Sequence, residues 1–197
     1  IERTPHHLAT QIAAFKQGKY PNGRELSESD KKEVEALLPG LENMQAEWQT
    51  LSYQPPTLTF TDELDIDLGN REVQVKYLGR GNTAGDAVVY LPNEKILVAG
   101  DLLVHPIPYT FDGYPAEWSQ TLRKMSQLPI ATIVPGHGPV QHDTKYLTLV
   151  ADLLASAVEQ IRARARQVGH PGFHSPEEVT GSVDLSEFRK QFAGEDK

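Results

Sequence analysis

Residues 79–101, together with the Val-Pro-Gly-His137-Gly segment further along, constrain the fold more than any other part of the sequence. In each place a short run rich in β-branched residues, 95–98 or 132–134, stops at a glycine-bearing turn. Glycine lets the backbone bend sharply, so the next side chain is presented at the edge of a sheet. The side chains so presented are Asp101 and His137. A carboxylate and an imidazole in this setting predict a divalent metal site.

Composition sets limits on the kind of protein. The 197 residues are 39% hydrophobic and 23% charged, which is typical of one folded domain with a sizeable core, so we expect a single domain over 1–197. The net charge of −8 argues against a nucleic-acid partner, which needs a basic face. No cysteine is present, so a metal site must use His, Asp, Glu or water. No apolar run is long enough to span a bilayer, so we expect no membrane partner. The sequence leaves the compartment, cytoplasmic or periplasmic, open.

Helical patterns come first along the chain. Residues 4–17 predict a helix that starts at Thr4-Pro5 and ends before Gly18. Ser27 and Asp30 form a capping-box pattern, which opens a helix that we expect to stop at Pro39-Gly40. A further helix is expected over 41–51. We therefore treat 1–56 as a helical N-terminal segment.

From residue 57 the apolar period changes to two, which predicts strands. A first hairpin turns at Gly69-Asn70, and a second joins two nearly continuous apolar runs that predict strands buried on both faces. The expected strands are 58–60, 64–68, 73–77, 87–91 and 95–99, and the expected helices are 118–128, 146–168 and 185–192, the last capped by Asp184. This order predicts an α+β core over 57–168, half of a layered αββα sandwich, followed by a C-terminal loop and short helix over 169–197.

Gly-Asp101 after a strand, followed by Pro-Gly-His137-Gly, resembles the later half of the metallo-β-lactamase superfamily of zinc-dependent hydrolases over about residues 58–140. The resemblance implies that the Asp101 carboxylate bridges two zinc ions and that His137 binds the second. Two features depart from the family pattern. Asn82 stands where many members carry a histidine ligand, and the first ligand cluster, His-x-His-x-Asp-His, is absent, because His6-His7 is followed by no Asp-His. Since the chain also begins at Ile1, we expect an incomplete copy that lacks the N-terminal strands of a longer polypeptide.

Each candidate site residue has a plainer interpretation beside the functional one. Asp101 as a metal ligand competes with a turn-capping aspartate, and His137 with a loop histidine bonded to the backbone. Asp86 is balanced between a metal ligand and a carboxylate that accepts several N–H donors at a strand start. The remaining candidates are assigned to the substrate or to the outer shell of the site, with turn organisation or packing as the alternative: Asn82, Thr83, His105, Tyr109 and Tyr114.

We therefore expect a zinc-dependent hydrolase that uses a metal-bound hydroxide on a small-molecule substrate, with this chain carrying the later half of the site. A catalytic zinc centre takes three protein ligands, and the motifs supply fewer, so the isolated chain is expected to be inactive. The alternative is a non-catalytic remnant that serves as a binding or assembly module. In either case an unpaired sheet edge and apolar face predict association with another copy or with the missing N-terminal segment.

Overall fold

The computed structural model describes residues 3–48, 50–52, 54–108, 110, 113–168, 181 and 183–193. The chain forms two compact units, Ile1–Leu58 and Thr59–Lys197. No helix among the described residues is both long enough and apolar enough to cross a membrane.

The first unit is a pair of helices, α1 (Arg3–Lys16) and α2 (Glu28–Trp48), which contact each other. The capping box predicted at the start of α2 is present, because the Ser27 N–H donates to Asp30 Oδ2 and the Asp30 N–H to Ser27 Oγ, each at 3.2 Å. The predicted break at Pro39-Gly40 is wrong, since α2 continues through Pro39. A proline removes one intrahelical hydrogen bond and can be accommodated by a kink, and apolar residues on both sides of it keep helical spacing.

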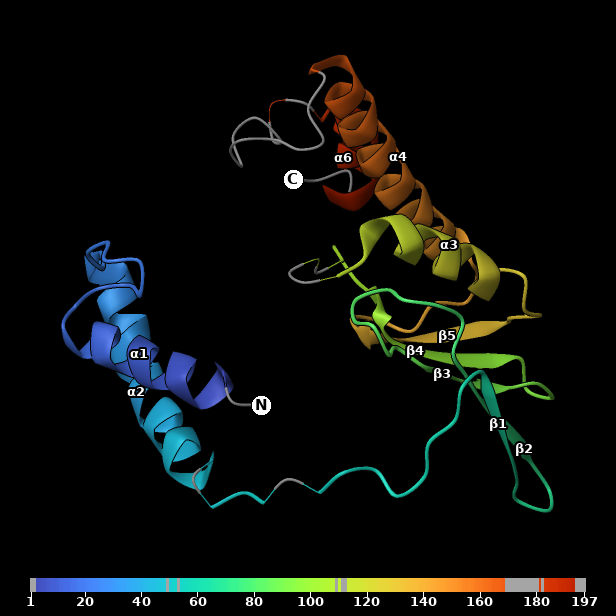
Figure 1. Ribbon diagram of the computed structural model, residues 1–197, viewed down its shortest axis with the longest axis horizontal. Helices are drawn as coiled ribbons and strands as arrows, with labels where there is room; N and C mark the ends of the chain where they lie inside the picture. The colour runs from blue at the N-terminus through green and yellow to red at the C-terminus, as the bar shows by residue number, and fades with distance from the viewer. Residues whose placement is uncertain are drawn as a thin grey trace. The chain divides into compact units, whose positions relative to one another are not determined.

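The second unit is built on one five-stranded sheet in the order β1-β2-β3-β4-β5 (Figure 1). Its strands are β1 (Glu63–Asp67), β2 (Glu72–Lys76), β3 (Val88–Leu91), β4 (Ile96–Val104) and β5 (Thr132–His137). The first four are antiparallel neighbours, and β5 pairs with β4 in parallel. The α+β class is thereby confirmed. The expected strand at 58–60 is absent, and Leu58 is 62% exposed.

Helices α3 (Pro115–Met125) and α4 (Lys145–Val168) lie together on one side of this sheet, and α6 (Ser186–Ala193) lies beside α4 (Figure 1). The core between sheet and helices includes the fully buried Trp118, Leu97, Leu122, Met125 and Ile133. Burial of one such aliphatic side chain stabilises the fold by about 1.5–3 kcal/mol. This core anchors β4 and β5, the two strands that carry the candidate site.

The other face of the sheet carries a row of apolar side chains that crosses all five strands. The strand register places Val75 opposite Val89, Val89 opposite Val98, and Val98 opposite Val134, with Leu64 completing the row on β1. None of them is fully buried, and Val98 is 37% exposed. Within the second unit, the prediction that β3 and β4 are buried on both faces is therefore wrong, because the described helices of this unit pack on the face that carries Val88, Tyr90, Leu97 and Ala99.

Candidate metal centre

Asp101 and His137 lie next to each other at the paired β4 and β5 strands. Their nearest side-chain atoms, Asp101 Oδ1 and His137 Nε2, are 3.5 Å apart, and the two side chains are 49% and 62% exposed. Asp101 lies inside β4, whereas the sequence predicted it just after the strand, but the ladder to β5 shifts register on both sides of Gly100–Asp101. An irregularity of this kind re-aims a side chain out of the ladder.

Gly136 permits this close approach of the two strands. A Cβ built on Gly136 would lie 2.2 Å from Asp101 Oδ1, 2.7 Å from the Gly100 carbonyl carbon and 2.9 Å from the Asp101 nitrogen. Two of these three atoms are backbone atoms, so rotation of a side chain would not relieve the clash. The glycine of the Pro-Gly-His motif is thus required for packing, in addition to the turn role expected from the sequence.

His105 supports the His137 turn from the side. Its N–H donates to the His137 carbonyl oxygen at 3.0 Å, and a Cβ on Gly138 would lie 2.7 Å from His105 Cβ. The His105 ring packs on Tyr146, with ring centroids 4.9 Å apart. Tyr146 in turn donates to the Val104 carbonyl oxygen at 2.7 Å, and burial raises the pKa of its phenol to about 12. His105 therefore contacts the His137 turn, and its assignment to the substrate or to the outer shell of the site stays a prediction. Nothing in the sequence distinguished Tyr146 as part of this support.

The second group of candidates, Asn82, Thr83 and Asp86, lies in the loop between β2 and β3. Both Asp86 carboxylate oxygens accept hydrogen bonds from Thr83, one from its N–H and one from its hydroxyl, each at 2.7 Å. Asp86 thus has the donors that an aspartate at a strand start needs, and its role as a metal ligand stays a prediction. Asn82 is partly buried and Thr83 is exposed.

This loop is fastened to α3 and β4. The Tyr114 N–H donates to the Gly81 carbonyl oxygen at 2.8 Å, and the Arg80 guanidinium lies 4.5 Å from the centre of the Tyr114 ring. A Cβ on Gly81 would lie 2.2 Å from Leu102 Cδ2, so the loop packs against the residue that follows Asp101. Tyr114 therefore orders the loop from the start of α3, while Tyr109 lies outside the described residues.

The donor set fits a divalent metal ion in part. An imidazole nitrogen beside a carboxylate oxygen is a combination that zinc accepts. Among the described residues, however, no three His, Asp or Glu side chains gather closely enough to hold one ion. The structure thus brings two of the three proposed metal ligands together.

Comparison with known proteins gives a family match across this region. A family model described as the Metallo-beta-lactamase superfamily matches residues 11–137, a range that includes both Asp101 and His137. The chain is similar to the metallo-beta-lactamase type 2 of Bacteroides fragilis, with 37% identity over 89 residues, or 42% of this chain and 36% of that protein. It is also 32% identical over 108 residues to the metallo-beta-lactamase type 2 of Bacillus sp. (strain 170), covering 52% of this chain and 42% of that protein.

Among solved structures, a metallo-beta-lactamase from Pontibacter korlensis aligns with 61% of this chain and 61% of its own, at 28% identity and a TM-score of 0.47. The chain spans roughly two fifths of the length of the curated relatives it matches.

Proposed function

Because the chain belongs to the metallo-beta-lactamase superfamily, we propose that it supplies one part of the active site of a zinc-dependent hydrolase. The observation that carries the proposal is the 3.5 Å approach of Asp101 Oδ1 and His137 Nε2, the two side chains that the Gly-Asp and Pro-Gly-His-Gly motifs single out. In this proposal Asp101 and His137 hold the metal, and His105 positions the His137 turn through its N–H.

Zinc in such a site supplies Lewis acidity toward the scissile bond and lowers the pKa of a water molecule that it carries. The residues of this chain would hold the zinc ion in place and order the loop beside it. Gly136 lets the Asp101 carboxylate approach the His137 side chain. The two hydrogen bonds from Thr83 to the Asp86 carboxylate order the loop that packs beside Leu102. We propose that the remaining metal ligands come from polypeptide outside residues 1–197, because a catalytic zinc centre takes three protein groups.

A zinc-titrated hydrolysis assay tests the proposal. The chain is assayed alone and as part of the polypeptide encoded by its complete gene, against generic ester, thioester, lactam and phosphodiester substrates. We expect negligible turnover by residues 1–197, and turnover by the longer polypeptide that is lost in Asp101→Ala and His137→Ala. Equal turnover by the short chain would contradict the partial site, and unchanged turnover in either variant would remove that residue from it.

A second candidate function, an assembly module without catalysis, is favoured by the apolar row on the sheet face opposite the described helices of the second unit. Analytical ultracentrifugation distinguishes the two candidates when it is run beside the assay. A complete, zinc-loaded polypeptide that is folded and inactive, but in which Val98→Asp disrupts self-association, would favour the module. Activity that survives Val98→Asp in a monomer would favour the hydrolase.

A further inference from the structure

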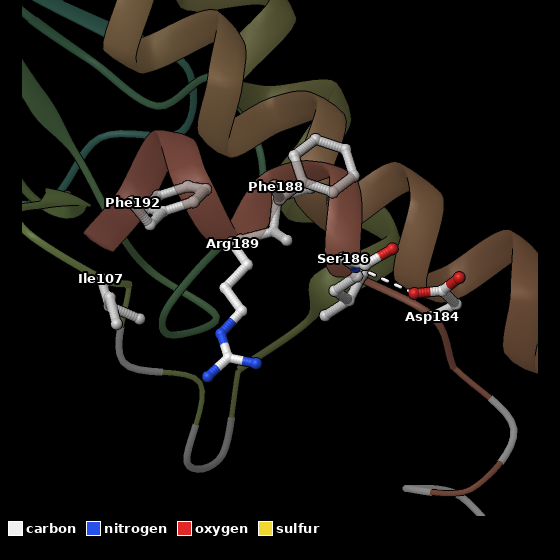
Figure 2. A pocket seen from close by; sticks show the side chains of 8 residues that line it. Ile107, Asp184, Ser186, Phe188, Arg189 and Phe192 are labelled. Carbon is white, nitrogen blue, oxygen red and sulfur yellow. Dashed lines mark hydrogen bonds between the residues drawn. The ribbon is translucent and has the colours of Figure 1, made fainter. Parts of the chain in front are cut away.

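A pocket of about 460 Å³ lies between α4, α6 and the segment that follows β4 (Figure 2). Eight of the described residues line it, and five of these are apolar; the eight are Ile107, Leu153, Asp184, Leu185, Ser186, Phe188, Arg189 and Phe192. A mostly apolar wall with few polar groups, in a volume between about 300 and 1,000 Å³, is typical of small-molecule sites. No member of this lining is among the residues assigned to the candidate metal centre.

Contacts outside the pocket hold its walls in place. The Gln160 side-chain amide on α4 makes two hydrogen bonds to the Asp184 backbone. It donates to the Asp184 carbonyl oxygen at 2.9 Å and accepts from the Asp184 N–H at 2.7 Å. The Asp184 carboxylate accepts the Ser186 N–H at 2.9 Å and thereby caps α6. Phe192, at the other end of α6, packs edge-on against Tyr146 at 5.9 Å between ring centroids. These contacts fix the positions of α4 and α6, which form the walls of the pocket.

Among the described residues that line the pocket, Arg189 is the one cation. The Asp184 carboxylate is directed at the Ser186 N–H, while the Arg189 side chain extends away from α6 (Figure 2). Within the part of the chain that the structure describes, the Arg189 guanidinium has no ion pair, although its backbone N–H donates to the Leu185 carbonyl oxygen at 3.2 Å. A guanidinium beside an apolar wall is suited to a planar anionic group on an apolar body.

We propose that this pocket binds a small organic monocarboxylate, with its carboxylate on Arg189 and its hydrocarbon body against Phe188, Leu185 and Ile107. One guanidinium balances one negative charge. A phosphate ester would bring close to two negative charges at neutral pH, and the described lining offers one cation, Arg189, beside the acidic Asp184. The proposal stands independently of the metal centre, because it uses none of that site's residues.

Isothermal titration calorimetry with three probes that share one hydrocarbon chain tests this assignment. Octanoate, 1-octanol and octyl phosphate are titrated into the chain and into Arg189→Gln, with Arg162→Gln as the matched control, because Arg162 is an exposed arginine on α4 outside the pocket. Loss of a charge-assisted pair predicts about tenfold weaker octanoate binding in Arg189→Gln. The same variant should bind 1-octanol unchanged, and Arg162→Gln should match the original chain with every probe.

A pocket-filling variant, Leu153→Trp, tests whether the ligand binds inside this pocket. Circular dichroism checks that the variant is folded. It should abolish the binding of octanoate and of 1-octanol while leaving the helical signal unchanged; if it unfolds, the Arg189→Gln comparison decides the question. No saturable octanoate binding, equal octanoate affinity in Arg189→Gln, or tighter binding of octyl phosphate than of octanoate would each overturn the proposal.

Discussion

Gly136 on β5 lies so close to Asp101 on β4 that a Cβ at position 136 would be 2.2 Å from Asp101 Oδ1. The glycine and the carboxylate are 35 positions apart in the sequence, yet one sets the place of the other. This relationship ties the geometry of the candidate metal centre to the packing of two parallel strands.

Gly136→Ala should therefore weaken zinc binding by about tenfold or more, because the Asp101 carboxylate has to move from its place beside His137. The added methyl group also meets backbone atoms, so the free energy of unfolding should fall by about 1–3 kcal/mol. Gly85→Ala is the matched control, since a Cβ there meets nothing within 4 Å. Zinc competition with a chromophoric chelator and urea unfolding measure the two effects, and equal zinc affinity in both variants would contradict the packing argument.

Tyr146→Phe tests the support behind His137. It removes the hydroxyl that donates to the Val104 carbonyl oxygen, which should cost about 1–2 kcal/mol of stability. Zinc affinity should fall by at least about threefold, because the lost hydroxyl holds the Val104–His105 peptide, whose N–H donates to the His137 carbonyl oxygen. Tyr90→Phe removes an equivalent bond, from the Tyr90 hydroxyl to the Pro129 carbonyl oxygen at 2.8 Å, away from the candidate metal centre. Similar zinc affinity in the two variants would show that Tyr146 contributes stability alone.

Asp86→Ala separates loop organisation from metal binding. The change removes both acceptors for Thr83, so unfolding free energy should fall by about 1–3 kcal/mol. If Asp86 only orders the loop, Thr83→Ala should produce part of the same loss, and zinc affinity should change by a similar small factor in both variants. A much larger loss of zinc affinity in Asp86→Ala than in Thr83→Ala would place the Asp86 carboxylate on the metal.

Acidification should release the start of α6. The N–H of Ser186 holds the pKa of the Asp184 carboxyl below its ordinary value. A depressed carboxyl pKa means that the stabilisation is complete above the unfolded value of about 3.9 and is lost as the pH falls through the folded value. The Ser186 amide resonance, followed by NMR below pH 5, should report this titration. In Asp184→Asn the cap is kept without an ionisable group, so a titration that persists there would assign it to another residue.

Much of the second unit could be predicted from the sequence, because period-two runs and capping residues are local signals. The hairpin at Gly69-Asn70 and the cap at Asp184 are both present in the structure. The path of α2 through Pro39 could not be predicted, since the packing of the surrounding helix, and not the local propensity of proline, determines whether a helix continues. The burial of the sheet also escaped prediction, because an apolar run does not reveal which layer covers each of its faces.

In the candidate site, too, local signals predicted some residues and tertiary contacts determine the others. Asp101 and His137 follow glycine turns, a local signal, and the structure places them together. The supports provided by Gly136 and Tyr146 depend on contacts between β4, β5 and α4 that no local pattern encodes.

A double-mutant cycle on zinc affinity tests the central claim, that Asp101 and His137 bind one metal ion together. Zinc is titrated into the original chain, Asp101→Ala, His137→Ala and the double variant, with His142→Ala as the control for an exposed histidine in the segment after β5. We predict that each single change weakens binding by about tenfold or more and that the double variant is little weaker than either one, because a single remaining ligand holds zinc poorly. His142→Ala should bind as the original chain does. Unchanged affinity in the single variants, or independent losses that multiply in the double variant, would contradict a shared metal ion.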